Sequence, residues 1–212
     1  MLKIYVYVLD TMADWELGYV TAELHSKRFF KKNAPQMEFK TVGLTTDPIK
    51  TMGGMTIIPD CTIDDIEISK SSTLLLPGGD TWNDPKHGAI LGKVNELLSA
   101  DATVCAICGA TVALACCGLL DQRPHTSNGV GFLDMVAPGY KGQSFYIDEP
   151  AVTDHNLITA ACTGSLLWAK QIIEHLGVFQ ADTLEAWYNY FNTGKAEYFY
   201  AMMQSVQHGS EN

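Results

Sequence analysis

A cysteine at the end of a short apolar run is the residue best placed for covalent chemistry. The apolar run covers residues 103–107, Cys108 follows it, and the small residues Gly109 and Ala110 come next. A strand that turns sharply into a helix at a nucleophile needs small neighbours, because bulky side chains would clash there. At the start of a helix, unpaired N–H groups favour the thiolate, so we expect a lowered pKa for Cys108.

A glycine-rich loop is a candidate oxyanion hole. Gly78 and Gly79 follow an apolar run over residues 73–77. Glycine allows the backbone to approach a reacting group closely, so the N–H groups of Gly79 and Gly109 are predicted to hold a developing oxyanion. The same pattern also fits an ordinary tight turn after a strand.

Glu16 is the acid expected nearest to this cysteine. It falls in the first turn of a helix that follows the first apolar run. The carboxyl ends of parallel strands lie at one edge of a sheet, which brings the three segments together there. Compensation of the helix dipole by the acid is the alternative explanation. Trp15 and Trp82 lie beside these segments, where they either line the pocket or act as core or interface anchors.

Four other cysteines are interpreted as small apolar side chains in the interior. They are Cys105, Cys116, Cys117 and Cys162. Cys105 and Cys108 spell C-x-x-C, but three extended residues separate their Cα atoms by about 10 Å. A disulfide requires less than about 7 Å, so we expect this pair not to close.

The spacing of apolar residues predicts a doubly wound α/β fold with a mostly parallel sheet. Strands are expected at residues 3–9, 38–44, 73–77, 103–107 and 157–161. Helices are expected near residues 15–30, 86–98, 110–117 and 165–176.

Two segments interrupt this alternation. Residues 144–147 and 151–153, together with the strand at 157–161, are separated by turn residues and predict a small antiparallel excursion at the sheet edge. The aromatic-rich segment 181–203 is expected to form one or two helices, broken near Asn192–Gly194. We interpret it as a helical cap on the main body or at a dimer interface.

Length and charge favour one globular α/β domain that does not bind polyanions. The chain has 212 residues, of which 47% are hydrophobic, and a net charge of −10. Nucleic acid and anionic membranes are therefore not expected partners. We expect the α/β domain to cover residues 1–180 and a C-terminal helical extension, residues 181–205, to pack on it.

The chain is expected to be cytoplasmic and to need no cofactor. Its amino-terminal apolar run is far shorter than the roughly 20 residues that span a bilayer, and it lacks a small-residue cleavage site. Six cysteines at irregular positions, without a secretion signal, indicate reduced thiols. Dinucleotide and P-loop motifs are missing, and the histidines lack paired ligand spacing with the cysteines, so we expect no metal.

Four segments in this order resemble the PfpI/DJ-one superfamily. They are Trp15–Leu17, Leu75–Gly79, Ala106–Ala110 and Asn156–Ala160, and the resemblance covers about residues 3–178. It implies a flavodoxin-like three-layer sandwich of the class I glutamine amidotransferase-like type, usually dimeric. It also implies that Cys108 is the nucleophile of the elbow and that Glu16 is the glutamate of the superfamily.

Two departures from the superfamily pattern bear on the reaction. Peptidase-type members carry a histidine directly after the cysteine, where this chain has Gly109, so a peptidase is disfavoured. Several other members place a histidine at the end of the next strand, where Asn128 stands, and His125 is the alternative if that strand shifts. Glu16 then becomes the expected proton donor and acceptor, and is expected to be protonated while Cys108 is ionised.

The leading hypothesis is a cysteine-dependent hydrolase, lyase or amidase that acts on a small electrophilic substrate. The resemblance also allows glyoxalase and hydratase types. The alternative is an oxidation sensor or a protective, chaperone-like protein without turnover, in which Cys108 is oxidised to sulfinic acid. The expected partners are a small molecule and a second copy of the chain.

Overall fold

The computed structural model describes residues 1–211, with side chains described for residues 1–206. A seven-stranded sheet has the order β5-β2-β1-β6-β7-β9-β8 and is parallel except for β8, which runs antiparallel to β9. Its strands are β1 (Leu2–Tyr7), β2 (Met37–Gly43), β5 (Cys61–Thr62), β6 (Ser72–Leu76), β7 (Thr103–Ile107), β8 (Ala151–Asp154) and β9 (Leu157–Ala160). A separate two-stranded hairpin joins β3 (Ile49–Lys50) and β4 (Thr56–Ile57).

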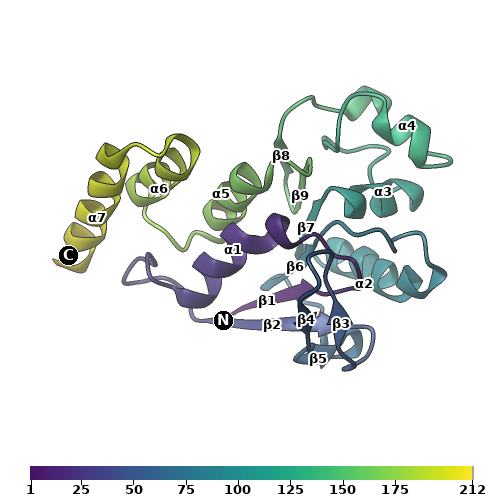
Figure 1. Cartoon of the computed structure of the whole chain (residues 1–212), viewed down its shortest axis with the longest axis horizontal. Coiled ribbons are helices and arrows are strands. Elements are labelled where there is room, and N and C mark those ends of the chain that lie inside the picture. The colour runs from purple at the N-terminus through teal and green to yellow at the C-terminus, as the bar shows by residue number, and fades with distance from the viewer. Residues whose placement is uncertain (212) are drawn as a thin grey trace.

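Helices cover both faces of the sheet, which confirms the predicted three-layer α/β sandwich (Figure 1). One layer contains α1 (Asp14–Ser26) and α5 (Ser165–Leu176), which pack against each other, and the other contains α2 (Gly88–Ser99) and α3 (Gly109–Cys116). A short helix, α4 (Phe132–Val136), lies outside α3, and 3₁₀ turns occupy Ile63–Asp65, Pro85–His87 and Gln143–Phe145. None of the helices within residues 1–211 is both long and apolar enough to cross a membrane.

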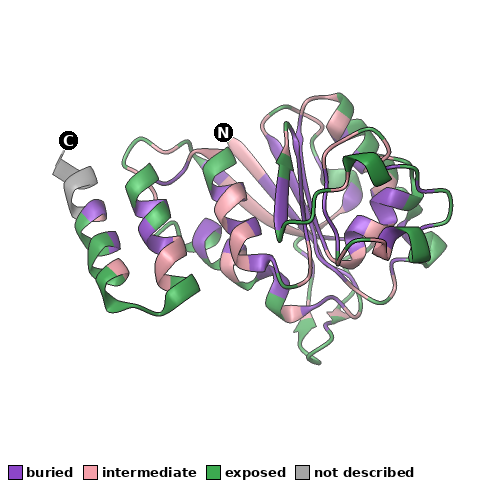
Figure 2. Ribbon diagram, turned by 90° about the horizontal axis from the view of Figure 1, so that it is seen from above, coloured by how far each residue is buried: buried purple, intermediate pink, exposed green. Residues whose placement is uncertain are grey.

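The central strands are buried along their whole length because helices cover them on both sides. Every residue of β6 and of β7 is buried, and Figure 2 shows these strands as the buried centre of the molecule. A strand buried on both faces reads as a continuous apolar run rather than an alternating one. The register pairs Leu74 with Val104 and Val104 with Leu157, so the ends of β6, β7 and β9 lie at the same edge.

One predicted strand is wrong. Residues 144–147 do not form a strand: Gln143–Phe145 is a 3₁₀ turn, and Tyr146 forms only an isolated parallel bridge with His125. Gln143–Phe145 is exposed, and the Phe145 N–H bonds locally to Gly142. No core covers this segment, so it does not join the sheet, and the antiparallel excursion is limited to β8 and β9.

The C-terminal segment forms a helical hairpin, as the aromatic spacing predicts. It consists of α6 (Ala181–Thr193) and α7 (Ala196–Glu211), which pack on each other at the end of the molecule beyond α5 (Figures 1 and 2). The break between them falls at Gly194, whose positive φ of 69° suits glycine. Trp187 attaches α6 to the body: it is fully buried, and its Nε1 donates to Glu23 Oε1 of α1 at 3.0 Å.

Candidate active site

Cys108 lies at the turn between β7 and α3, in a backbone conformation that is unusual for a residue with a side chain. Its φ is 56° and its ψ is −122°, a region that costs energy for any residue except glycine. The surrounding structure holds it there, because the Cys108 N–H donates to Ala160 O at 2.9 Å. Thr111 Oγ1 donates to Cys108 O at 2.6 Å. The elbow places the thiol at the sheet edge, half-buried.

Glu16 reaches this edge from the first turn of α1. Its side chain is fully buried, and Oε2 accepts a hydrogen bond from the Gly78 N–H at 2.6 Å. The two loops are also joined by the Ala13 N–H, which donates to Gly78 O at 3.0 Å. For Oε1, no hydrogen-bond partner is found among the residues that the structure describes.

Gly78 separates the acid from the thiol, and only glycine fits there. A Cβ atom on Gly78 would lie 2.8 Å from Cys108 Cβ and 2.8 Å from Glu16 Oε1. Real Cβ atoms do not approach other atoms so closely, so the two side chains face the same small space. The structure thus brings together Glu16, Gly78 and Cys108.

The two glycines of the predicted oxyanion hole are also adjacent. Gly79 N and O lie 3.3 and 3.1 Å from the position that a Cβ atom on Gly109 would occupy. A side chain on Gly109 would also meet the Trp82 ring, whose Cδ1 lies 3.3 Å from the same position. The Gly109 N–H bonds to the Cys108 sulfur and thereby lowers its pKa. Their role toward an oxyanion stays a prediction.

Burial gives the Glu16 carboxyl an unusual affinity for protons. Loss of water around the charged form raises the pKa of Glu16 to about 7, although the hydrogen bonds of Gly78 and Cys108 act in the opposite direction. An acid with this pKa changes its charge near neutrality, which suits a general base.

The pKa of the Cys108 thiol shifts opposite to the expectation from the helix terminus. Burial raises the pKa of Cys108 to about 12, the hydrogen bond from Asn128 lowers it, and the charge of Glu16 raises it further. Loss of hydration outweighs the helix dipole at this half-buried sulfur. The raised pKa of Cys108 runs against the predicted state in which Cys108 is ionised and Glu16 is protonated, and it favours a protonated sulfur beside a Glu16 carboxyl that titrates near neutrality.

Of the two candidates for a third position, Asn128 is the one beside the thiol. Its Nδ2 donates to Cys108 Sγ at 3.4 Å, and its Oδ1 accepts from the Cys162 N–H at 2.9 Å. An amide cannot accept the thiol proton, so Asn128 stabilises negative charge on sulfur and acts as no base.

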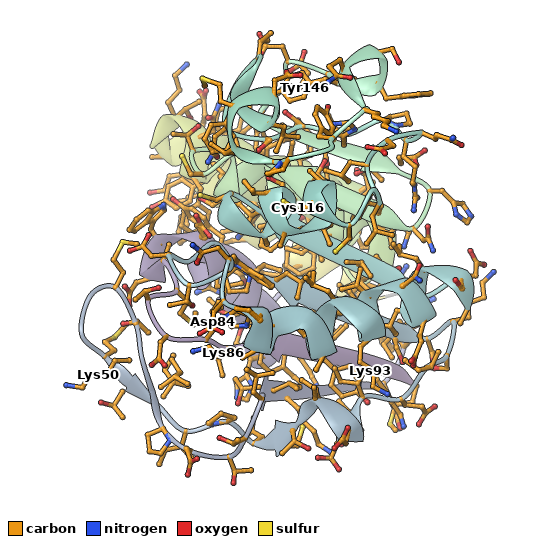
Figure 3. The ribbon with its side chains drawn as sticks, turned by 90° about the vertical axis from the view of Figure 1, so that its right-hand side faces the viewer. Lys50, Asp84, Lys86, Lys93, Cys116 and Tyr146 are labelled. Carbon is orange, nitrogen blue, oxygen red and sulfur yellow. The ribbon has the colours of Figure 1, made fainter. Side chains whose placement is uncertain are left out.

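His125 is fully buried and is engaged elsewhere. Its Nδ1 lies 2.6 Å from Arg123 O and its Nε2 lies 2.7 Å from the Tyr140 hydroxyl. A carbonyl oxygen only accepts, so Nδ1 carries the proton and Nε2 accepts from Tyr140. Tyr146 contacts the His125 ring edge-on. Figure 3 shows Tyr146 at the opposite end of the view from Lys50 of the β3–β4 hairpin. Both nitrogens are thus occupied away from the thiol.

The two tryptophans have different positions. Trp82 is buried under the glycine loop, where Nε1 donates to Pro77 O at 2.8 Å and the ring packs on Tyr7 and His87. It supports the loop from the interior. Trp15 is 54% exposed beside Glu16, so it borders solvent. No cluster of three or more metal-ligating side chains occurs in the part of the chain that the structure describes.

Comparison with known proteins identifies the family. The sequence model described as the DJ-1/PfpI family matches residues 2–175, which is most of the chain. This chain belongs to the DJ-1/PfpI family. The strand-turn-helix elbow at Cys108 and the resemblance inferred from four short segments agree with this membership.

Individual relatives match from about two thirds to nearly all of the chain. A Bacillus subtilis protein named "Uncharacterized protease YoaZ" is 44% identical over 204 residues, 96% of this chain and 97% of its own. A thiJ/pfpI family crystal structure from Bacillus anthracis has a TM-score of 0.93 and 45% identity, with 96% of each chain covered. The "Glutathione-independent glyoxalase DJR-1.2" of Caenorhabditis elegans is 25% identical over 136 residues, 63% of this chain and 70% of its own.

Sequence reasoning missed one residue at this DJ-1/PfpI site. Cys116, Cys117 and Cys162 were interpreted as interior apolar side chains, but Cys116 and Cys117 at the end of α3 are exposed. Cys162 is half-exposed, and its N–H bonds to Asn128 beside the thiol. A signal was present in the sequence, since Cys162 follows the strand β9 and therefore leaves the sheet at the same edge as Cys108.

Proposed function

We propose that this DJ-1/PfpI family chain is an enzyme in which the Cys108 sulfur adds to an electrophilic carbon of a small substrate. One observation carries the proposal: a buried carboxyl with a pKa of about 7, that of Glu16, shares with the Cys108 thiol the space left by Gly78. A nucleophile paired with a base near its working pH is the requirement for this chemistry.

The reaction begins with proton transfer within the pair. Glu16, as a carboxylate, takes the thiol proton while the sulfur attacks the carbonyl carbon and the π electrons move to oxygen. The N–H groups of Gly79 and Gly109 hold the oxyanion that forms. With an amide, protonated Glu16 gives the proton to the leaving amine, the C–N bond breaks and a thioester with Cys108 remains. With an α-oxoaldehyde, Glu16 moves the C1 proton of the hemithioacetal to C2, which gives a 2-hydroxyacyl thioester. In both cases water then attacks the thioester, and release of the acid and of the free thiol completes the hydrolase, amidase or lyase cycle.

The surroundings of the thiol favour a small carbonyl compound or amide over a peptide. Among the described residues no histidine contacts the Cys108 sulfur, because Gly109 follows the cysteine and His125 bonds to Tyr140 and Arg123. The relatives carry the names protease and glyoxalase. We therefore place α-oxoaldehydes first and simple amides second as substrate classes.

Turnover of glyoxal and of simple amides by purified protein tests the proposal. Cys108→Ser and Glu16→Gln should each abolish most turnover, whereas Cys116→Ser, an exposed site at the end of α3, should retain it. Full activity of Cys108→Ser on any substrate found would overturn the mechanism.

An oxidation sensor without turnover is the second candidate. It is supported by Glu16 Oε1, for which no hydrogen-bond partner is found among the described residues. When protonated, this atom can donate a hydrogen bond to an oxygen added to the Cys108 sulfur. Selective oxidation of Cys108 by mild peroxide, combined with no turnover of either substrate class, would favour the sensor over the enzyme.

A further inference from the structure

Cys162 and Cys108 follow the carboxyl ends of two neighbouring parallel strands, β9 and β7. Ile107 is paired with Ala160, and the Cys108 N–H bonds to Ala160 O. The residue opposite Cys108 is therefore Ala161, and Cys162 is the next residue along the chain. In ideal parallel strands, about 4.8 Å between strands and 3.8 Å between successive Cα atoms correspond at this offset to a Cα separation of about 6 Å. This separation falls within the range that a disulfide spans.

Asn128 gives independent support for this closeness. One side-chain amide bonds to both residues: its Nδ2 donates to Cys108 Sγ at 3.4 Å and its Oδ1 accepts from the Cys162 N–H at 2.9 Å. Both cysteines are half-exposed, so a small oxidant reaches them. By contrast, Cys105 is fully buried in β7 and points away from this space.

We propose that Cys162 is the resolving thiol for Cys108, and that the two form a reversible disulfide when the protein meets a hydroperoxide. The proposal rests on the nucleophilic Cys108 of the proposed function and describes the regulation of that site. The disulfide would occupy the sulfur that attacks substrate, so oxidised protein is inactive until a thiol reductant restores it.

The steps balance with the hydroperoxide as the only oxidant. The Cys108 sulfur attacks the O–O bond and loses its proton to Glu16, the alkoxide or hydroxide leaves with that proton, and Cys108 becomes a sulfenic acid. The Cys162 thiol then attacks the Cys108 sulfur and displaces water, and the S–S bond forms. Cys108 and Cys162 together lose two electrons, which reduce the hydroperoxide to an alcohol or to water.

Intact and peptide mass spectrometry after stepwise addition of hydrogen peroxide tests this proposal. Wild-type protein should lose about 2 Da, with the link mapped to Cys108 and Cys162. Cys162→Ser should instead gain about 32 Da on Cys108, because the sulfenic acid has no partner and proceeds to sulfinic acid. Cys116→Ser, which alters an exposed cysteine on the α3 face seen in Figure 3, should behave as wild type.

Recovery of activity is the second measurement. A dithiol should restore most turnover to oxidised wild-type protein and almost none to oxidised Cys162→Ser, since sulfinic acid is not reduced by thiols. Wild-type protein that gains about 32 Da, or that links other cysteines, would overturn the proposal. Turnover by the reduced wild-type protein separates the two proposals. If reduced protein shows no turnover, the proposed enzymatic function is contradicted. If it shows turnover but peroxide forms no Cys108–Cys162 disulfide, only the resolving role of Cys162 is contradicted.

Discussion

In the proposed mechanism the Glu16 carboxyl is the residue on which the reaction depends, because burial raises its pKa to about 7. The same environment keeps the proton on Cys108, whose pKa is raised to about 12. A resting thiol beside an ionisable carboxyl reacts only when the proton moves between them. The site therefore needs a base more than it needs a preformed thiolate.

Replacement of this base should reveal the proton transfer. In wild-type protein kcat/KM should rise as pH increases through about 7, because Glu16 accepts a proton only when ionised. Glu16→Gln keeps the size of the side chain but cannot accept the proton, so kcat/KM should fall by about 10²–10⁴-fold. A pH–rate profile measured on glyoxal gives both values, and an unchanged rise through neutrality in the variant would contradict the assignment.

The same carboxyl should make stability depend on pH. The pKa of Glu16 is raised in the folded state from 4.5 to about 7, so the neutral acid stabilises the fold fully below 4.5 and loses this effect as pH rises through 7. Glu16→Gln has no such loss. The free energy of unfolding of Glu16→Gln relative to wild type should therefore increase by roughly 2.5 kcal/mol between about pH 5 and about pH 8. Urea unfolding at the two pH values measures the difference, and a constant difference would refute the raised pKa.

At the scale of elements, the site is a junction of three loops. The start of α1, the loop after β6 and the turn from β7 to α3 meet where parallel strands end, and backbone hydrogen bonds such as Ala13 N–H to Gly78 O join them. In the proposed mechanism each loop supplies one part of the chemistry, and we expect a small change in any of them to displace the others.

Gly78→Ala should damage the site more than the fold. The added Cβ must push apart Cys108 and Glu16, which we expect to lower kcat/KM by about 10²-fold and stability by about 1–3 kcal/mol. The matched control is Gly92→Ala in α2, where nothing lies within 4 Å of the new atom. Alanine there should raise stability by roughly 0.5–1 kcal/mol. Equal activity of the two variants would contradict the close approach at Gly78.

For the whole molecule, the hairpin of α6 and α7 is held to the α/β body mainly through α6. Trp187 is fully buried among Tyr19, Phe179 and Phe191, and it donates to the buried Glu23. The division into an α/β domain over residues 1–180 and a packed extension stays a prediction. It requires that the extension contribute to the stability of the body.

Trp187→Ala tests this contribution. Loss of a fully buried indole and its hydrogen bond should lower the free energy of unfolding by about 3–5 kcal/mol. Tyr200→Ala on α7, where the ring is 63% exposed, should change it by less than about 0.5 kcal/mol. Chemical denaturation followed by far-UV circular dichroism gives both values, and similar effects of the two substitutions would count against the packed extension.

Association into a homodimer is the remaining prediction at this scale. Members of the resembled superfamily are usually dimeric, and we expect a solution mass twice that of one chain. Light scattering coupled to size-exclusion chromatography measures this mass. A mass equal to one chain across a hundredfold dilution series would exclude the dimer.

The sequence alone determined the fold class and the elbow, because both depend on local patterns. Continuous apolar runs predict strands buried on both faces, and a cysteine between a strand and two small residues predicts the turn that Cys108 makes. The exposed run at residues 144–147 misled the same reasoning, since an apolar alternation forms a strand only when a core covers it.

Tertiary structure decided which distant residues reach the thiol and what charge each carries. Asn128 lies beside Cys108 while His125, only three residues earlier, turns into the interior toward Tyr140. The raised pKa of Glu16 and the approach of Cys162 likewise depend on burial and on strand register. Desolvation and contact between segments are properties of the packed chain, so no local pattern contains them.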